Sequence, residues 1–186
     1  MTETASITSL PTRPLTMAGI FLTGTLGGAV LGAITNSVNG LVSPYYFVTI
    51  MGWYDIQDVW RASVAQGIFE GLLFGAGFSL IFTTGAGIIT HASSPYGFAI
   101  RHQLGILVAT FGCWLFGGIA GIGLAVLSPP FYQATFIGVP DEFLAMVAFA
   151  WVGGSIWGVE IGGLISVVLG LVTLRGNWLK RHLNER

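Results

Sequence analysis

The sequence predicts an all-α integral membrane protein whose four transmembrane helices form two tandem glycine-rich hairpins. Three observations lead to this prediction. The composition is 53% hydrophobic with 28 glycines and only 15 formally charged side chains, which lies outside the range of soluble domains. Four apolar runs are each long enough to cross a bilayer, which takes about 20 residues. The second half of the chain also repeats the residue pattern of the first, so we expect one membrane domain, residues 1–186, built from two halves.

The first hairpin is predicted over residues 17–90, after a short lead-in rich in serine and threonine. Its two spans, 17–42 and 59–90, carry small residues at four-residue intervals, a spacing that lets two helix backbones approach closely in lipid. Pro44 ends the first span, because the residue before a proline resists the helical conformation. The glycines expected to pack in this hairpin are Gly24, Gly28, Gly32, Gly67, Gly71 and Gly75.

The second hairpin is predicted over residues 104–174, with spans at 104–127 and 143–174. A polar link, 91–103, is expected to precede it, and a basic cytoplasmic tail, 175–186, to follow it. The same small-residue spacing recurs and predicts close helix packing. The glycines expected to pack in this hairpin are Gly117, Gly121, Gly154, Gly158 and Gly162.

The two connections inside the hairpins, 45–60 and 131–142, are rich in aromatic and acidic residues. Such mixed aromatic and acidic segments suit the headgroup layer of a membrane. We therefore expect interfacial segments here rather than free loops, on the side of the membrane away from the chain termini.

An internal duplication is predicted because the two hairpins match at nine positions when one is laid on the other. Each hairpin contains an even number of spans, so both halves enter the membrane in the same sense, and we expect a pseudo-twofold axis along the membrane normal. With two one-residue shifts along the chain, the matched pairs are Gly27 with Gly112, Gly32 with Gly117, Ser43 with Ser128, Pro44 with Pro129, Gly52 with Gly138, Asp55 with Asp141, Gly67 with Gly154, Gly71 with Gly158, and Gly75 with Gly162.

The basic residues predict the orientation. Of the seven lysines and arginines, only Arg61 falls on the side of the two aromatic connections. Positive charge concentrates on the cytoplasmic side of membrane proteins. Both termini are therefore expected in the cytoplasm, with the protein in a plasma or inner membrane. The residues on the cytoplasmic side are Arg13, Arg101, Arg175, Lys180, Arg181 and Arg186.

Glu70 is the most informative single residue, because a carboxylate within a span costs about 2.5 to 3.5 kcal/mol and is usually kept with a partner, a water-filled cavity or a task. At about 100° per residue, Ser63, Gln66 and Glu70 lie on one face of the second span. Asn36 and Asn39 lie at similar depth on the first span. This arrangement predicts an outward-opening polar vestibule with Glu70 at its floor, able to bind a cation or to take up and release a proton.

Glu160 is a second carboxylate inside a span and lies three residues beyond the repeat position of Glu70. Both carboxylates are expected to look to broadly the same side of their spans. They either form a pair on a common axis, or Glu160 is an isolated protonated acid. The alternative for the vestibule is that its amides are interhelical hydrogen-bonding groups and Glu70 is a neutral member of that network.

Several classes of function are excluded by composition and placement. The near-neutral net charge of −1 and the lack of a basic run before the spans argue against nucleic-acid binding. The three histidines lie outside the spans, so we expect neither a metal site nor a haem. No span pairs a serine with a histidine, and every aspartate is in a connection, so we expect neither an enzyme nor a cofactor. Cys113 is expected to be a small buried hydrophobe.

The function that the sequence favours is a self-associating, multi-pass membrane protein that gives an ion, a proton or a small polar solute a path. Its binding groups would be Glu70, Glu160, Asn36, Asn39, Ser63 and Gln66. Its expected partners are the lipid bilayer and either further copies of itself or other membrane subunits. The alternative is a non-catalytic scaffold or accessory subunit of a larger membrane complex, whose glycine rows dock on partner helices.

Overall fold

The computed structural model describes residues 13–184, and over this range every regular element is a helix. Four helices are long and apolar enough to cross a membrane, with mean hydropathies of 1.7 to 1.9, which indicates an integral membrane protein. The all-helical class and the number of membrane-length helices are confirmed. The elements are α1 (Arg13–Val42), α2 (Pro44–Met51), α3 (Val59–Thr90), α4 (Tyr96–Leu127), α5 (Pro129–Thr135) and α6 (Phe143–Asn184).

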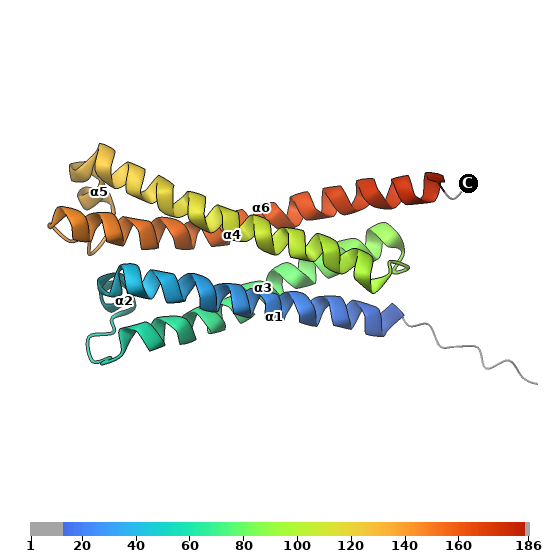
Figure 1. Ribbon diagram of the computed structural model, residues 1–186, viewed down its shortest axis with the longest axis horizontal. Helices are drawn as coiled ribbons and strands as arrows, with labels where there is room; N and C mark the ends of the chain where they lie inside the picture. The colour runs from blue at the N-terminus through green and yellow to red at the C-terminus, as the bar shows by residue number, and fades with distance from the viewer. Residues whose placement is uncertain (1–12, 185–186) are drawn as a thin grey trace, which may run out of the picture.

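The long helices form two crossing pairs that lie side by side (Figure 1). The main contacts are between α1 and α3 and between α4 and α6, while α1–α4 and α3–α6 contacts join the pairs. The short helices α2 and α5 lie at one end of the bundle. The start of α1, the end of α6 and the α3–α4 connection lie at the other end, called here the terminal end. Most of the predicted lead-in lies outside the described residues, as does Arg186.

Local sequence accounts for the helical connections. Ser43 begins α2, because its hydroxyl oxygen accepts a hydrogen bond from the backbone N–H of Tyr46 at 3.3 Å, and Pro44 fits the first helical position. Gly52 ends α2 at φ +68°, and Gly138 after α5 has φ +74°. This left-handed conformation favours glycine. Both aromatic connections therefore begin with a short helix.

Three boundaries differ from the prediction. The first long helix begins at Arg13 and not at Met17, so residues 13–16 of the predicted lead-in are helical. The third long helix begins at Tyr96, so the predicted polar link 91–103 is wrong and only residues 91–95 connect the pairs. The helix starts where Pro95 stands at its N-cap position, and the polar residues Arg101, His102 and Gln103 lie in its second turn. The fourth helix does not end at Leu174 but continues through the predicted tail to Asn184, because the arginines and lysine there are good helix formers.

The crossing helices touch backbone to backbone. A Cβ atom added to Gly71 would lie 2.3 Å from the Gly28 carbonyl oxygen, and one added to Gly32 would lie 2.0 Å from that of Gly67. In the other pair, a Cβ atom on Gly154 would lie 2.4 Å from the carbonyl oxygen of Gly117. These distances leave no room for a methyl group, so neither pair could keep its present separation with alanine at these positions.

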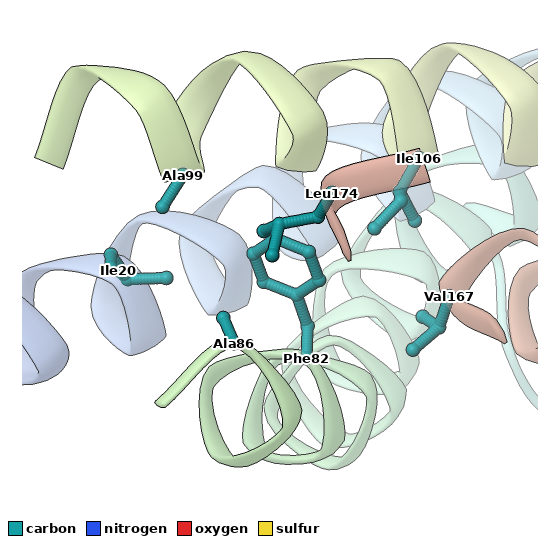
Figure 2. Close-up of a cluster of buried hydrophobic side chains, with 7 residues drawn as sticks. All are labelled: Ile20, Phe82, Ala86, Ala99, Ile106, Val167 and Leu174. Atoms are coloured by element: carbon teal, nitrogen blue, oxygen red, sulfur yellow. The ribbon is translucent and has the colours of Figure 1, made fainter. Parts of the chain in front are cut away.

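A cluster of buried apolar side chains closes the bundle toward its terminal end (Figure 2). All four long helices contribute to this cluster, and the ring of Phe82 is 1% exposed. The members are Ile20, Phe82, Ala86, Ala99, Ile106, Val167 and Leu174.

A pair of glycines on α3 offers a test of the close crossing. Alanine favours a helix over glycine by about 1 kcal/mol, and a Cβ atom on Gly77 would meet nothing within 4 Å. We expect G77A to unfold in detergent at the wild-type temperature or above it. G71A should lose about 1 to 3 kcal/mol of stability, because its methyl group forces the backbones apart. Tryptophan fluorescence during heating measures both, and equal midpoints for the two variants would contradict the close crossing.

Candidate functional site

A cavity of about 90 Å³ lies between the four long helices. This volume is enough for several water molecules. Six of the fifteen residues in its wall on the α1 and α3 side are glycine, and its wall on the α4 and α6 side is largely apolar. Glu70 from the first pair and Glu160 from the second both line it. The two carboxylates that the sequence singled out therefore share one cavity.

The carboxylates have different surroundings. A Glu70 carboxylate oxygen accepts a hydrogen bond of 2.8 Å from the side-chain amide of Gln66, one turn earlier on α3. Glu160 is half-buried and close enough to Glu70 for the two charges to interact. The two helix pairs thus each place one acidic side chain at the same cavity.

The predicted amides lie at the same cavity but also join helices. Asn36 and Asn39 are buried and line the cavity with Glu70. The Asn39 side-chain oxygen accepts a hydrogen bond of 3.1 Å from the hydroxyl of Ser155 on α6. Its amide nitrogen donates to the side-chain oxygen of Asn36 at 3.5 Å. These contacts link α1 to the second pair near the α2 and α5 end.

Two predicted residues lie outside the cavity wall. The Ser63 hydroxyl, fully buried, donates to the backbone oxygens of Trp60 at 2.7 Å and Asn36 at 3.2 Å. Gln66 approaches the cavity only through its bond to Glu70. Of the six predicted binding residues, the structure thus brings together Asn36, Asn39, Glu70 and Glu160.

Sequence reasoning missed a polar stripe on α4. Gln103, Thr110 and Trp114 all line the cavity, and spacings of seven and eleven residues place them within about 20° of one line on the helix. The Gln103 amide nitrogen donates to the Ser79 hydroxyl at 3.4 Å. Among the described residues, the Gln103 side-chain oxygen and the Trp114 ring nitrogen have no hydrogen-bond partner, although these residues are 5% and 4% exposed. Their spacing would have revealed the stripe had Gln103 been placed in a helix.

No protein-family model, curated protein or solved structure matches this chain. Within residues 13–184 there is no group of three or more histidine, cysteine, aspartate or glutamate residues that could hold a metal ion. The function is therefore inferred from the geometry of the cavity.

Two tyrosines from the short helices lie beside each other on the second pair, and one of them, Tyr46, is near the carboxylates. Burial raises the pKa of Tyr46 in α2, and the charges of Glu160 and then Glu70 raise it further. Burial, with a smaller effect of Tyr46, raises the pKa of Tyr132 in α5 to about 12. A Cβ atom on Gly153 of α6 would lie 3.9 Å from both hydroxyl oxygens. The short helices thus pack two neutral phenols onto the second pair.

The raised pKa of Tyr132 predicts a stability change in alkali. A folded-state pKa above the unfolded value of about 10 stabilises the fold below pH 10, and this contribution is lost as the pH rises toward 12. We expect the unfolding midpoint of the wild type to fall over this range and that of Y132F to fall less. Thermal unfolding at pH 8, 10 and 11.5 measures the difference, with Y54F as control because Tyr54 is exposed. A parallel decline in Y132F and wild type would contradict the assignment.

Proposed function

We propose that this protein binds an ion, a proton or a small polar solute in its central cavity and gives it a path across the membrane. The proposal depends on one observation: Glu70 and Glu160, from different helix pairs, line one cavity between four membrane-length helices. A carboxylate in a span costs about 2.5 to 3.5 kcal/mol. A cation or a proton bound between the two acids would offset both this cost and their mutual repulsion.

The unpartnered polar atoms support the same proposal. Leaving a buried donor or acceptor without a partner costs about 1 to 3 kcal/mol. The Gln103 oxygen and the Trp114 N–H belong to residues that line the cavity, so water or a polar solute there would satisfy both. The apolar cluster around Phe82 is then the barrier at the terminal end, and the Asn39–Ser155 contact is the barrier at the other.

We also infer that the two hairpins are copies of one ancestral hairpin. In the register predicted from the sequence, Gly32 and Gly67 correspond to Gly117 and Gly154. In the first half, Gly32 and Gly67 make the closest backbone approach. In the second half, the approach of Gly117 and Gly154 is within a few tenths of an ångström of the closest. The left-handed glycines after α2 and α5 are a further matched pair. These equivalent contacts support the duplication.

The proposed orientation places both termini in the cytoplasm of a plasma or inner membrane. Five of the basic residues that the structure describes lie toward the terminal end, and Arg61 lies near the start of α3, at the opposite end. The positive-inside rule then puts α2 and α5 outside.

Flux through proteoliposomes tests the proposed path. We expect the wild type to carry at least one of H⁺, Na⁺ or K⁺ faster than empty liposomes. E70Q and E160Q should lower this flux at least tenfold, because the amide keeps the shape of the side chain but cannot hold the charge or exchange the proton. D55N is the matched control, since Asp55 is exposed and outside the spans. Wild-type flux in an assembled E70Q variant would refute the role of Glu70.

A scaffold or accessory subunit is the second candidate. The observation in its favour is that Asn39 and Ser63 make hydrogen bonds that join helices without needing a ligand. Purification in mild detergent separates the candidates. Under the path proposal we expect assemblies of this chain alone, whereas stoichiometric copurification with a different protein, together with no flux above that of empty liposomes, would favour the scaffold.

A further inference from the structure

The second helix pair carries a groove of about 760 Å³ that runs between α4 and α6 and reaches Tyr46 and Tyr132 of the short helices. Its walls are mostly apolar and include Cys113, Trp157 and Ile161. Unlike the central cavity, it is lined by no residue of α1 or α3, so it opens to whatever surrounds the bundle.

The groove corresponds to the central cavity in the repeat register. That register adds 85 to positions in α1 and 87 to positions in α3, as in the pairs Gly32 with Gly117 and Gly67 with Gly154. Fifteen residues of α1 and α3 line the cavity, and the equivalents of twelve of them line the groove. The face of the second pair that lines the groove is therefore equivalent to the face of the first pair that lines the cavity.

The second pair meets the first through a different face. Nine residues of α4 and α6 line the cavity, and none of them is equivalent to any of the fifteen on α1 and α3. A twofold axis would bring equivalent faces together. Because the faces that meet here are not equivalent, the hairpins are packed head to tail and not by the twofold relation expected from the sequence. On the first pair, the equivalents of the nine form an outer face. Its most exposed large members, Leu22, Phe69, Leu73 and Leu80, are 57% to 63% exposed.

Single contacts show the same difference. A Cβ atom on Gly27 would lie 2.6 Å from Leu107 of the second pair, whereas one on the equivalent Gly112 would meet nothing within 4 Å. Phe78 packs against Gly163 across the two pairs, whereas its equivalent Ile165 is 53% exposed. The groove face of the second pair is thus uncovered, whereas the equivalent face of the first pair is covered by the second pair.

We infer that a second copy of this chain docks in the groove with the outer face of its first pair, the face that contains Leu22, Phe69, Leu73 and Leu80. The contact between copies then repeats the contact between hairpins within one chain. It leaves one free groove and one free outer face, so further copies add until the rotation closes a ring. This inference rests on the repeat register proposed above and not on the ion path.

The residues at this contact fit an apolar interface between copies. In the repeat register, Trp157 in the groove is equivalent to Glu70 in the cavity, and Leu73 on the outer face is equivalent to Glu160 in the cavity. Leu124 likewise replaces Asn39. Two such faces can pack in lipid without a buried charge, while each chain keeps its own pair of acids.

Disulfide cross-linking tests the register of the contact. Ile68 and Leu124 are the equivalents of Ser155 and Asn39, whose side-chain oxygens are 3.1 Å apart within one chain. In a C113A background, the double variant I68C and L124C, oxidised in native membranes, should form a ladder of dimers, trimers and larger species on a denaturing gel. Each single variant should stay monomeric, because a head-to-tail contact never brings a residue against itself.

The matched control is I68C with V126C. Val126 is exposed at the depth of Leu124 but about 160° away on the helix. We expect no ladder from this pair. A ladder from the control as strong as that from the test pair, dimers from a single-cysteine variant, or no ladder from the test pair would overturn the inference.

A groove-filling variant gives a second readout that does not depend on disulfide chemistry. Ala120 lines the groove, so A120W should shift the assembly to monomers by native mass spectrometry, while I119W on the adjoining exposed position should not. An unchanged mass for A120W, or a groove occupied by a different protein, would overturn the inference. Neither test measures transport, so a ladder without flux refutes only the path, and flux without a ladder refutes only the contact.

Discussion

In lipid, two helices gain little by hiding apolar side chains from one another, so their association depends on close packing. Here that packing is backbone against backbone, at Gly28 and Gly71 in one pair and at Gly117 and Gly154 in the other. Because no side chains stand between the helices, each crossing leaves a shallow face of small residues beside it. On the first pair this face forms a wall of the central cavity, and on the second it forms the floor of the groove.

The residues that line the cavity and those at the corresponding positions of the groove, in the register proposed above, differ in the direction that their surroundings require. Where the chain covers the face itself, it carries Asn36, Asn39 and Glu70, whose polar groups find partners or a cavity. Where the face is open, the equivalent residues are Gly121, Leu124 and Trp157. A polar or charged group against hydrocarbon is costly, so the residue types follow from which half is covered. The differences in residue type between the two halves of the chain thus follow from burial.

The number of long helices and the full extent of α3 were predictable from the sequence, because each is an apolar run long enough to cross a bilayer. The structure adds the local reasons for the bounds of α3: Asp58 caps its start, and the left-handed backbone at His91 ends it. The start of α4 was not predictable, since hydropathy marks the apolar part of a helix, and the polar residues Arg101, His102 and Gln103 lie near the start of this one. That error placed Gln103 in a link and concealed the stripe it forms with Trp114. Glycine spacing also predicts that two helices cross closely, but it is the same in both halves and does not indicate which face of one half meets the other.

Head-to-tail packing also explains how two acids that are not repeat equivalents share one cavity. Glu160 lies three residues beyond Trp157, a step of about 60° around α6, and this step moves it from the groove to the cavity. With twofold packing, the groove face of the second pair would meet the cavity face of the first, and Trp157 would lie opposite Glu70. Each chain therefore holds both acids at its own cavity, and the contact proposed between copies would keep these cavities apart by apolar residues. Under the two proposals above, each chain is one unit of binding, and association changes how many such units lie together.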